Sequence, residues 1–453
     1  MRDADGAVLP PAEAVALTET RPWRRGLLWL LFLGPFFFAS YGFANWWAAG
    51  HGTPGVLAFE WERRIPFLAW TIVPYWSIDL LYGLSFLLCR NRRETDRHAQ
   101  RLLTAQLISV ACFILFPLRF SFERPPTDGL FGRMFDILMG FDQPFNQAPS
   151  LHISLLLILW VRYAAASRGS WRLAVHGWAL LIGLSVLTTY QHHFIDVPTG
   201  LLAGAFSLWL WPDQGPSPLA GFHLTPCPTR RRLAFRYFVG ALACVLGAWA
   251  GGIALWLLWP AAALALVAFI YAWGGARSFQ KSGGDLSCGA TLILLPYLAG
   301  AWLNSRWWTH RHPAPDEIAD DVWLGRLPSR YDLADRPFAA VLDLTAELPC
   351  PADAGKGHAN LPWLDLVPPC PGELARAADE IARLRREGPV LVCCALGYSR
   401  SACAVAAWLL ASGRARGVDE AVALIAARRP RLVLGPAHRA ALATLVEGKT
   451  DGV

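Results

Sequence analysis

The chain has 453 residues, of which 54% are hydrophobic and 17% charged, with 22 tryptophans and a formal net charge of +7. This length exceeds one ordinary core, and the apolar residues come in long blocks, so we expect at least two domains and a membrane protein rather than a wholly soluble one. The arginines lie in short loops between apolar blocks, which indicates membrane topology and not nucleic-acid binding.

Six apolar blocks in the first half are each near the length that a bilayer requires. They predict an all-α polytopic bundle with a six-helix core, formed by residues 26–47, 66–88, 102–120, 151–166, 173–190 and 197–211. Two further blocks and a weaker, proline-interrupted one add two or three helices, at residues 235–251, 253–273 and 290–303.

Arginine clusters predict how this bundle is oriented in the membrane. The loops at 90–101, 162–172 and 230–232 carry them and are expected to be cytoplasmic. The alternate loops, around Thr53, Pro126 and His193, then face outward.

A soluble α/β pattern begins near residue 313. Short apolar runs predict strands at 322–324, 341–344 and 390–393, and amphipathic patterns predict helices at 374–386 and 401–411. Residues 329–337 and 349–371 are expected to be loops. The predicted organisation is therefore a cytoplasmic tail (1–25), a membrane domain (26–213), additional helices and loops (214–306) and a soluble α/β domain (307–453).

The ten cysteines show no paired framework and no C-x-x-C spacing. We therefore expect neither a disulfide scaffold nor a zinc site, and no metal or organic cofactor.

Two histidine clusters lie at outward-facing helix ends: Pro149-Ser150-Leu151-His152 and His192-His193-Phe194-Ile195-Asp196. Either cluster alone is typical of a solvated or interfacial loop. The two clusters lie on one membrane face together with a carboxylate, and this combination suggests a site. Ionisable groups at the ends of membrane helices are costly unless they are paired or functional. Neutral imidazole is a competent nucleophile near neutral pH, and a second imidazole serves as acid and base.

Their spacing resembles the P-S-G-H and S-R-x5-H-x3-D motifs of the type-2 phosphatidic acid phosphatase superfamily. The resemblance implies that His192 is the nucleophile, Asp196 its orienting partner and His152 the general acid, with Ser150 beside the phosphate. Leu151 and Val186 replace the family's glycine and arginine. Arg119 and Arg124, and also Arg133, are expected to bind phosphate instead. This reduced motif also resembles lipid phosphotransferases, so transfer to an alcohol remains an alternative to hydrolysis.

A second site is predicted where a buried strand, residues 390–393, runs into a short loop and a helix. Backbone N–H groups of such a loop cradle a dianionic phosphate and favour a thiolate at Cys394. Arg400 would bind phosphate oxygens in a bidentate way, and Ser401 would donate to the thiolate. The alternative is a buried cysteine followed by a chance arginine. The expected phosphate-binding residues of the loop are Ala395, Leu396, Gly397, Tyr398 and Ser399.

These residues resemble the H-C-x2-G-x2-R-S signature of cysteine-based protein tyrosine and dual-specificity phosphatases, over residues 318–448. Cys393 stands where that signature has histidine. The resemblance implies a general acid upstream, for which Asp365 is the first candidate and Asp353 and Asp343 weaker ones.

The order of domains resembles a bacterial fusion of these two phosphatase types. It implies an integral membrane phosphatase with two phosphomonoester-hydrolysing sites, acting on lipid or lipid-linked phosphates in phospholipid metabolism. A phosphotransferase and a regulatory binding protein with degraded sites remain alternatives. We expect residues 290–303 to be re-entrant or interfacial, which keeps the C-terminal domain cytoplasmic; a full crossing would put it outside.

Overall fold

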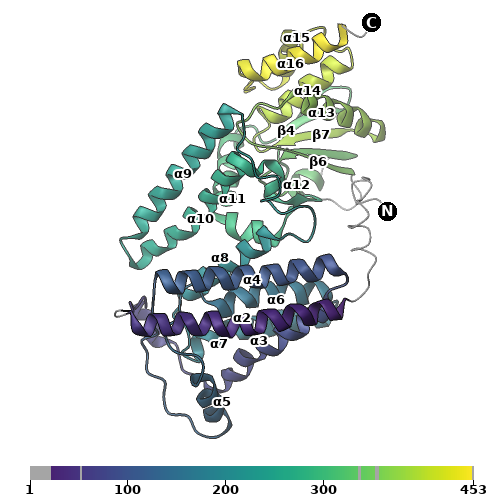
Figure 1. Ribbon diagram of the computed structural model, residues 1–453. Coiled ribbons are helices and arrows are strands. Elements are labelled where there is room, and N and C mark those ends of the chain that lie inside the picture. The colour runs from purple at the N-terminus through teal and green to yellow at the C-terminus, as the bar shows by residue number, and fades with distance from the viewer. Residues whose placement is uncertain (1–21, 52–53, 335–337, 352–356, 451–453) are drawn as a thin grey trace. The chain divides into compact units, whose positions relative to one another are not determined.

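The computed structural model describes residues 22–51, 54–334, 338–351 and 357–450 (Figure 1). Most of the expected tail and the candidate acid Asp353 lie outside these residues. The chain forms two compact units that divide between Ala220 and Gly221, and each is described by itself.

The first unit is helical. Its elements are α2 (Trp23–Gly50), η1 (Glu60–Arg64), η2 (Ala69–Thr71), α3 (Ile72–Ser85), η3 (Phe86–Leu88), α4 (Arg92–Leu115), α5 (Gly129–Met139), α6 (Leu151–Ala166), α7 (Ser170–Thr188) and α8 (Asp196–Leu210). Helix α4 ends earlier than the expected block at 102–120, because Pro117 follows and the backbone becomes extended.

Two glycines bring α6 and α8 into close contact. A Cβ atom at Gly200 would lie 2.6 Å from the Ser150 carbonyl oxygen, and one at Gly204 would lie 2.7 Å from that of Ser154. Small residues permit this approach of two helix backbones. It places the N-terminal ends of α6 and α8, which carry the two histidine motifs, beside each other.

All nine expected membrane segments are helical. Six of the described helical stretches are long and apolar enough to cross a membrane by length and composition: Trp23–Gly50, Ala69–Leu88, Arg92–Leu115, Ser170–Thr188, Gly252–Gly274 and Cys288–Thr309. Helices α6 and α8, of 16 and 15 residues, are shorter.

The second unit begins with an apolar hairpin. Helix α9 (Pro228–Ala248) packs against η4 (Gly252–Leu257), α10 (Leu258–Phe269) and η5 (Ile270–Gly274). After η6 (Ala276–Phe279), strands β1 (Lys281–Ser282) and β2 (Asp285–Leu286) pair antiparallel and lead into α11 (Cys288–Thr309). The proline-interrupted segment is thus one continuous helix through Pro296, and a re-entrant turn there is wrong.

A five-stranded sheet of order β3-β4-β7-β5-β6 organises the rest of this unit. Strands β4, β7, β5 and β6 run parallel, and β3 is an antiparallel edge. The elements are β3 (Asp316–Ala319), β4 (Val322–Arg326), α12 (Arg330–Ala334), β5 (Ala340–Thr345), β6 (Gly357–Trp363), α13 (Pro371–Leu384), η7 (Arg385–Glu387), β7 (Val390–Cys394), α14 (Arg400–Ala411), α15 (Val418–Arg428) and α16 (Pro436–Thr450).

Both expected loops contain regular structure. Helix α12 lies within 329–337, and β6 lies within 349–371. Strand β6 was not predicted because its sequence contains Pro362 and few β-branched residues. Proline is tolerated here because β6 is an edge strand of the sheet.

The two sheet faces carry different cores. Helices α13 and α14 contribute to a large apolar cluster on one face, which includes the side chain of Cys394. A smaller cluster on the other face contains Cys350 and Cys393, and Ala301 of α11 packs against it. Adjacent strand residues point to opposite faces. Cys393 and the expected nucleophile therefore belong to different environments.

Candidate active sites

The nucleophile candidate Cys394 ends β7 and is 3% exposed. Its sulfur accepts hydrogen bonds from the Gly397 N–H and the Ser401 hydroxyl, each 3.2 Å long. Two hydrogen-bond donors therefore converge on this one sulfur at the base of the loop. The structure thus brings together Cys394 and Ser401 as the sequence predicted.

The loop after Cys394 turns its carbonyl groups outward. The carbonyl of Ala395 accepts from the Ser305 hydroxyl, that of Gly397 from Arg429 Nε at 2.8 Å, and that of Tyr398 from the Val433 N–H at 2.9 Å. A peptide group that turns its oxygen outward turns the neighbouring N–H inward. The loop therefore presents N–H groups to the space above Cys394, where a phosphate would lie.

Glycine is required at position 397. Its φ is +72°, and a Cβ atom there would lie 2.4 Å from the carbonyl carbon of Gly325. The remaining loop side chains point elsewhere: the Tyr398 hydroxyl donates to the Trp308 carbonyl at 3.3 Å, and the Ser399 hydroxyl lies 3.4 Å from His438 Nε2. Leu396 contributes only its backbone to the loop as the structure describes it.

Arg400, the first residue of α14, is 2% exposed and closes the loop. Its guanidinium donates to both carboxylate oxygens of Glu347, at 2.9 and 2.7 Å, and to the Trp363 carbonyl at 2.9 Å. Although burial opposes it, the charge of Arg400 lowers the pKa of Glu347. Glu347 was not predicted, although it follows β5 at the edge of the parallel sheet where the loop lies.

Asp365, the expected general acid, reaches the same guanidinium. Its Oδ1 lies 3.1 Å from Arg400 Nη2, and its side chain is 35% exposed. Burial raises the pKa of this carboxyl, and the opposing charge of Arg400 does not cancel the effect. A raised pKa suits a group that must donate a proton. Of the weaker candidates, Asp343 is buried and paired with Lys281, and Asp353 is outside the described residues.

The arrangement supplies what phosphoryl transfer to a thiolate requires. A thiol lies below an N–H cradle, a fixed guanidinium lies where it would bind the equatorial oxygens of a phosphate, and a carboxyl group beside it would protonate the leaving oxygen. Residues 323–447 match the family described as dual specificity phosphatase, catalytic domain. These residues form a dual-specificity phosphatase domain, and the chain is a phosphoric monoester hydrolase.

Several solved structures are similar to about a third of this chain. Human DUSP28 is 20% identical over 30% of this chain and 99% of its own, with a TM-score of 0.28. PTPMT1 in complex with PI(5)P is 22% identical over 30% and 96%, with a TM-score of 0.28. Tk-PTP in the active form is 29% identical over 30% and 98%, with a TM-score of 0.27. No curated protein matches the chain. The assignment therefore rests on the family match and the loop geometry.

The histidine motifs of the first unit also meet. His192 Nδ1 lies 3.1 Å from Asp196 Oδ2, and the Ser150 N–H donates to the Asp196 carbonyl at 3.1 Å. The ring of His152 stacks on the ring of Tyr75, with the two centroids 4.1 Å apart. His152 also lies close enough to His192 for the two imidazoles to interact electrostatically. A carboxylate on Nδ1 favours the tautomer whose Nε2 carries the free lone pair.

The residues of the first unit that were expected to bind phosphate lie in different surroundings. Ser150 Oγ accepts from the Ile153 N–H at 3.3 Å and so caps α6. Arg119 is exposed, and Arg124 lies over the Phe135 ring at 4.4 Å. Asp142, which was not predicted, lies within range of the charges of Arg124 and His192. Within the described part of the chain, His152 Nε2 is buried without a hydrogen-bond partner.

Proposed function

We propose that the chain is an integral membrane phosphatase whose Cys394 site hydrolyses phosphomonoesters presented at the cytoplasmic surface of the membrane. The observation that supports this proposal is helix α11. It is apolar, and the catalytic domain holds it at both ends.

The start of α11 is tied to the domain through the preceding hairpin. The Cys350 N–H donates to the Gly284 carbonyl at 2.8 Å, and Lys281 is buried against Asp343. The end of α11 is tied through Ser305, which donates to the Ala395 carbonyl, and through Thr309, which accepts from Arg326 at 3.0 Å. A helix of 22 residues is about 33 Å long. Because one soluble domain binds both ends, α11 lies along that domain and does not cross the bilayer.

The exposed surface of α11 is suited to the membrane interface. It exposes five large apolar side chains: Leu295 (43%), Trp302 (49%), Leu303 (60%), Trp307 (74%) and Trp308 (57%). Tryptophan is enriched where hydrocarbon meets head groups. Helix α10 of the α9–α10 hairpin packs against α11. In this proposal the hairpin crosses the membrane and returns, so the domain stays on the side of the arginine-rich loops.

Access from this surface fits the position of the acid. The Tyr271 hydroxyl, at the end of the apolar hairpin, donates to the Asp365 carbonyl at 3.0 Å. The hairpin thus positions the backbone that carries the general acid. A phosphate on a lipid or a lipid-linked group would meet Cys394 without leaving the membrane surface.

A second site is proposed in the first unit, on the opposite membrane face. The unpartnered Nε2 of His152 and the His192–Asp196 pair support hydrolysis through a phosphohistidine, in which His152 Nε2–H would protonate the leaving oxygen. Hydrolysis and transfer to an alcohol both use this geometry. A new lipid product in place of free phosphate would indicate transfer.

Paired substrates test the membrane proposal. The full chain carrying His192→Ala, so that only the Cys394 site is counted, is reconstituted in vesicles and given phosphatidic acid in the same vesicles and soluble p-nitrophenyl phosphate. A Trp307→Ser chain is expected to show a several-fold lower ratio of lipid to soluble turnover, while Trp171→Ser, which removes an equally exposed tryptophan of the first unit, leaves the ratio unchanged. An unchanged ratio in Trp307→Ser would reject surface presentation.

The two sites are separated by single and double substitutions. Phosphate release from phosphatidic acid that persists in Cys394→Ser and disappears in Cys394→Ser with His192→Ala would establish the histidine site. Loss of all release in Cys394→Ser alone would reject it.

A further inference from the structure

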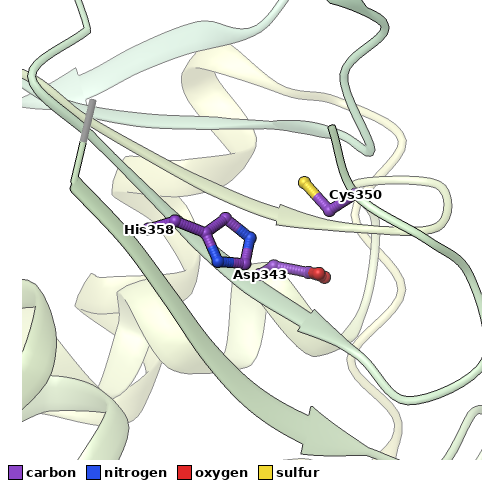
Figure 2. A group of neighbouring side chains, drawn as sticks. All are labelled: Asp343, Cys350 and His358. Atoms are coloured by element: carbon purple, nitrogen blue, oxygen red, sulfur yellow. The ribbon is translucent and has the colours of Figure 1, made fainter. Parts of the chain in front are cut away.

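Three side chains from separate elements converge on the sheet face opposite the large core. Asp343 lies on β5, Cys350 follows in the next loop, and His358 lies on β6; Figure 2 shows the three side chains turned toward one another. One ligand atom from each lies within 4.8 Å of the others. Cys350 is 1% exposed and Asp343 is fully buried.

We propose that Asp343, Cys350 and His358 form a structural zinc site beneath the phosphate loop. Thiolate, imidazole and carboxylate are the ligands that Zn²⁺ accepts, with bonds of about 2.0–2.3 Å. Tetrahedral geometry then puts ligand atoms about 3.5 Å apart, so the cluster needs to contract by only about an ångström.

An orphan nitrogen supports a ligand at this position. Nε2 of His358 is buried and has no hydrogen-bond partner among the residues that the structure describes. A buried imidazole nitrogen without a partner is unfavourable, and a metal ion would satisfy it. The other buried groups here are paired: Asp343 Oδ1 accepts from the Thr345 N–H and hydroxyl, each at 2.8 Å.

A fourth donor adjoins the cluster. The thiol of Cys393 is fully buried and belongs to the same core cluster as Cys350. Strand pairing also sets Cys393 opposite Asp343. In this site Asp343 would be shared between the metal and the Lys281 ammonium, which Asp343 already binds through Oδ2.

Zinc here would fix three connections of the active site. Asp343 precedes the segment that carries Glu347, β6 leads to the Asp365 loop, and Cys393 directly precedes Cys394. Metal binding would hold these segments in one register, since binding energy at a structural site is folding energy.

Metal analysis tests the site. The full chain, purified in detergent with ZnCl₂ and desalted, is expected to hold about one zinc ion per chain. Cys350→Ser and His358→Ala are expected to lose it, while Cys370→Ser, which removes an exposed cysteine of the same domain, retains it. CoCl₂ in place of zinc should give a sulfur-to-cobalt charge-transfer band that is absent in Cys350→Ser.

Several results would overturn the proposal. They are a zinc-free wild-type chain, zinc retained in both variants, or a Cys350–Cys393 disulfide found by mass spectrometry of the purified protein. If the variants do not fold, the wild-type chain decides: EDTA should lower its melting temperature and ZnCl₂ should restore it. No change with EDTA would contradict a structural metal.

Discussion

The carboxylate of Glu347 grips the guanidinium of Arg400 with two parallel hydrogen bonds, from Nη1 at 2.9 Å and from Nη2 at 2.7 Å. Both side chains are 3% exposed. The arginine that a phosphate needs is therefore already oriented before substrate arrives, and little side-chain entropy remains to be lost.

Glu347→Gln should weaken phosphate binding more than it slows chemistry. The variant keeps the shape of the side chain but loses the charge-assisted pair, worth about 1.5–3 kcal/mol. We expect kcat/KM for p-nitrophenyl phosphate to fall about tenfold or more, mainly through KM. Glu380→Gln, which breaks an exposed pair with Arg383, is the control. A fall confined to kcat would contradict the positioning role.

Asp365 should govern the alkaline limb of the pH–rate profile. A general acid works protonated, so activity falls as pH rises through its pKa, and burial moves that pKa above the ordinary value. Asp365→Asn is expected to reduce kcat about 10²-fold and to remove the limb. Asp379→Asn, on the exposed side of α13, should keep it. If the alkaline limb of the pH–rate profile remains in Asp365→Asn, another residue is the general acid.

Lys281 should be needed for folding. Its ammonium is 1% exposed and donates to Asp343, to the Thr345 hydroxyl at 2.7 Å and to the Thr345 carbonyl at 3.0 Å. Lys281→Met leaves a buried carboxylate unpaired, which costs about 3–5 kcal/mol. Arg439→Met, which breaks an exposed pair with Asp419, should cost no more than about 1 kcal/mol. Chemical denaturation of the two variants measures the difference, and equal losses would refute it.

The brace from α11 should stabilise the phosphate loop. Ser305→Ala removes the hydroxyl that satisfies the buried Ala395 carbonyl, a loss of about 1–3 kcal/mol. Thr291→Ala removes an exposed hydroxyl of the same helix and is the matched control. We expect only Ser305→Ala to lower both the melting temperature and the affinity for inorganic phosphate. Equal behaviour of the two variants would show that the brace is dispensable.

The part of the site that could be predicted is contiguous in sequence. Cys394, the loop and Arg400 form one strand, turn and helix, whose chemistry follows from local order. Glu347, Arg429 and Ser305 come from other elements, and only tertiary packing brings them to the loop and its arginine. Prediction of the helices succeeded where apolar blocks were long. The path of α11 depended on contacts at both of its ends, which no local pattern contains.

The central claim is that Cys394 attacks phosphorus. Full-length protein carrying His192→Ala, so that only the thiol site is counted, is mixed with p-nitrophenyl phosphate, quenched by denaturation and examined by peptide mass spectrometry. We expect a phosphate on the Cys394 peptide, and neither that adduct nor turnover once Cys394→Ser is added. Undiminished phosphate release after Cys394→Ser would contradict the account.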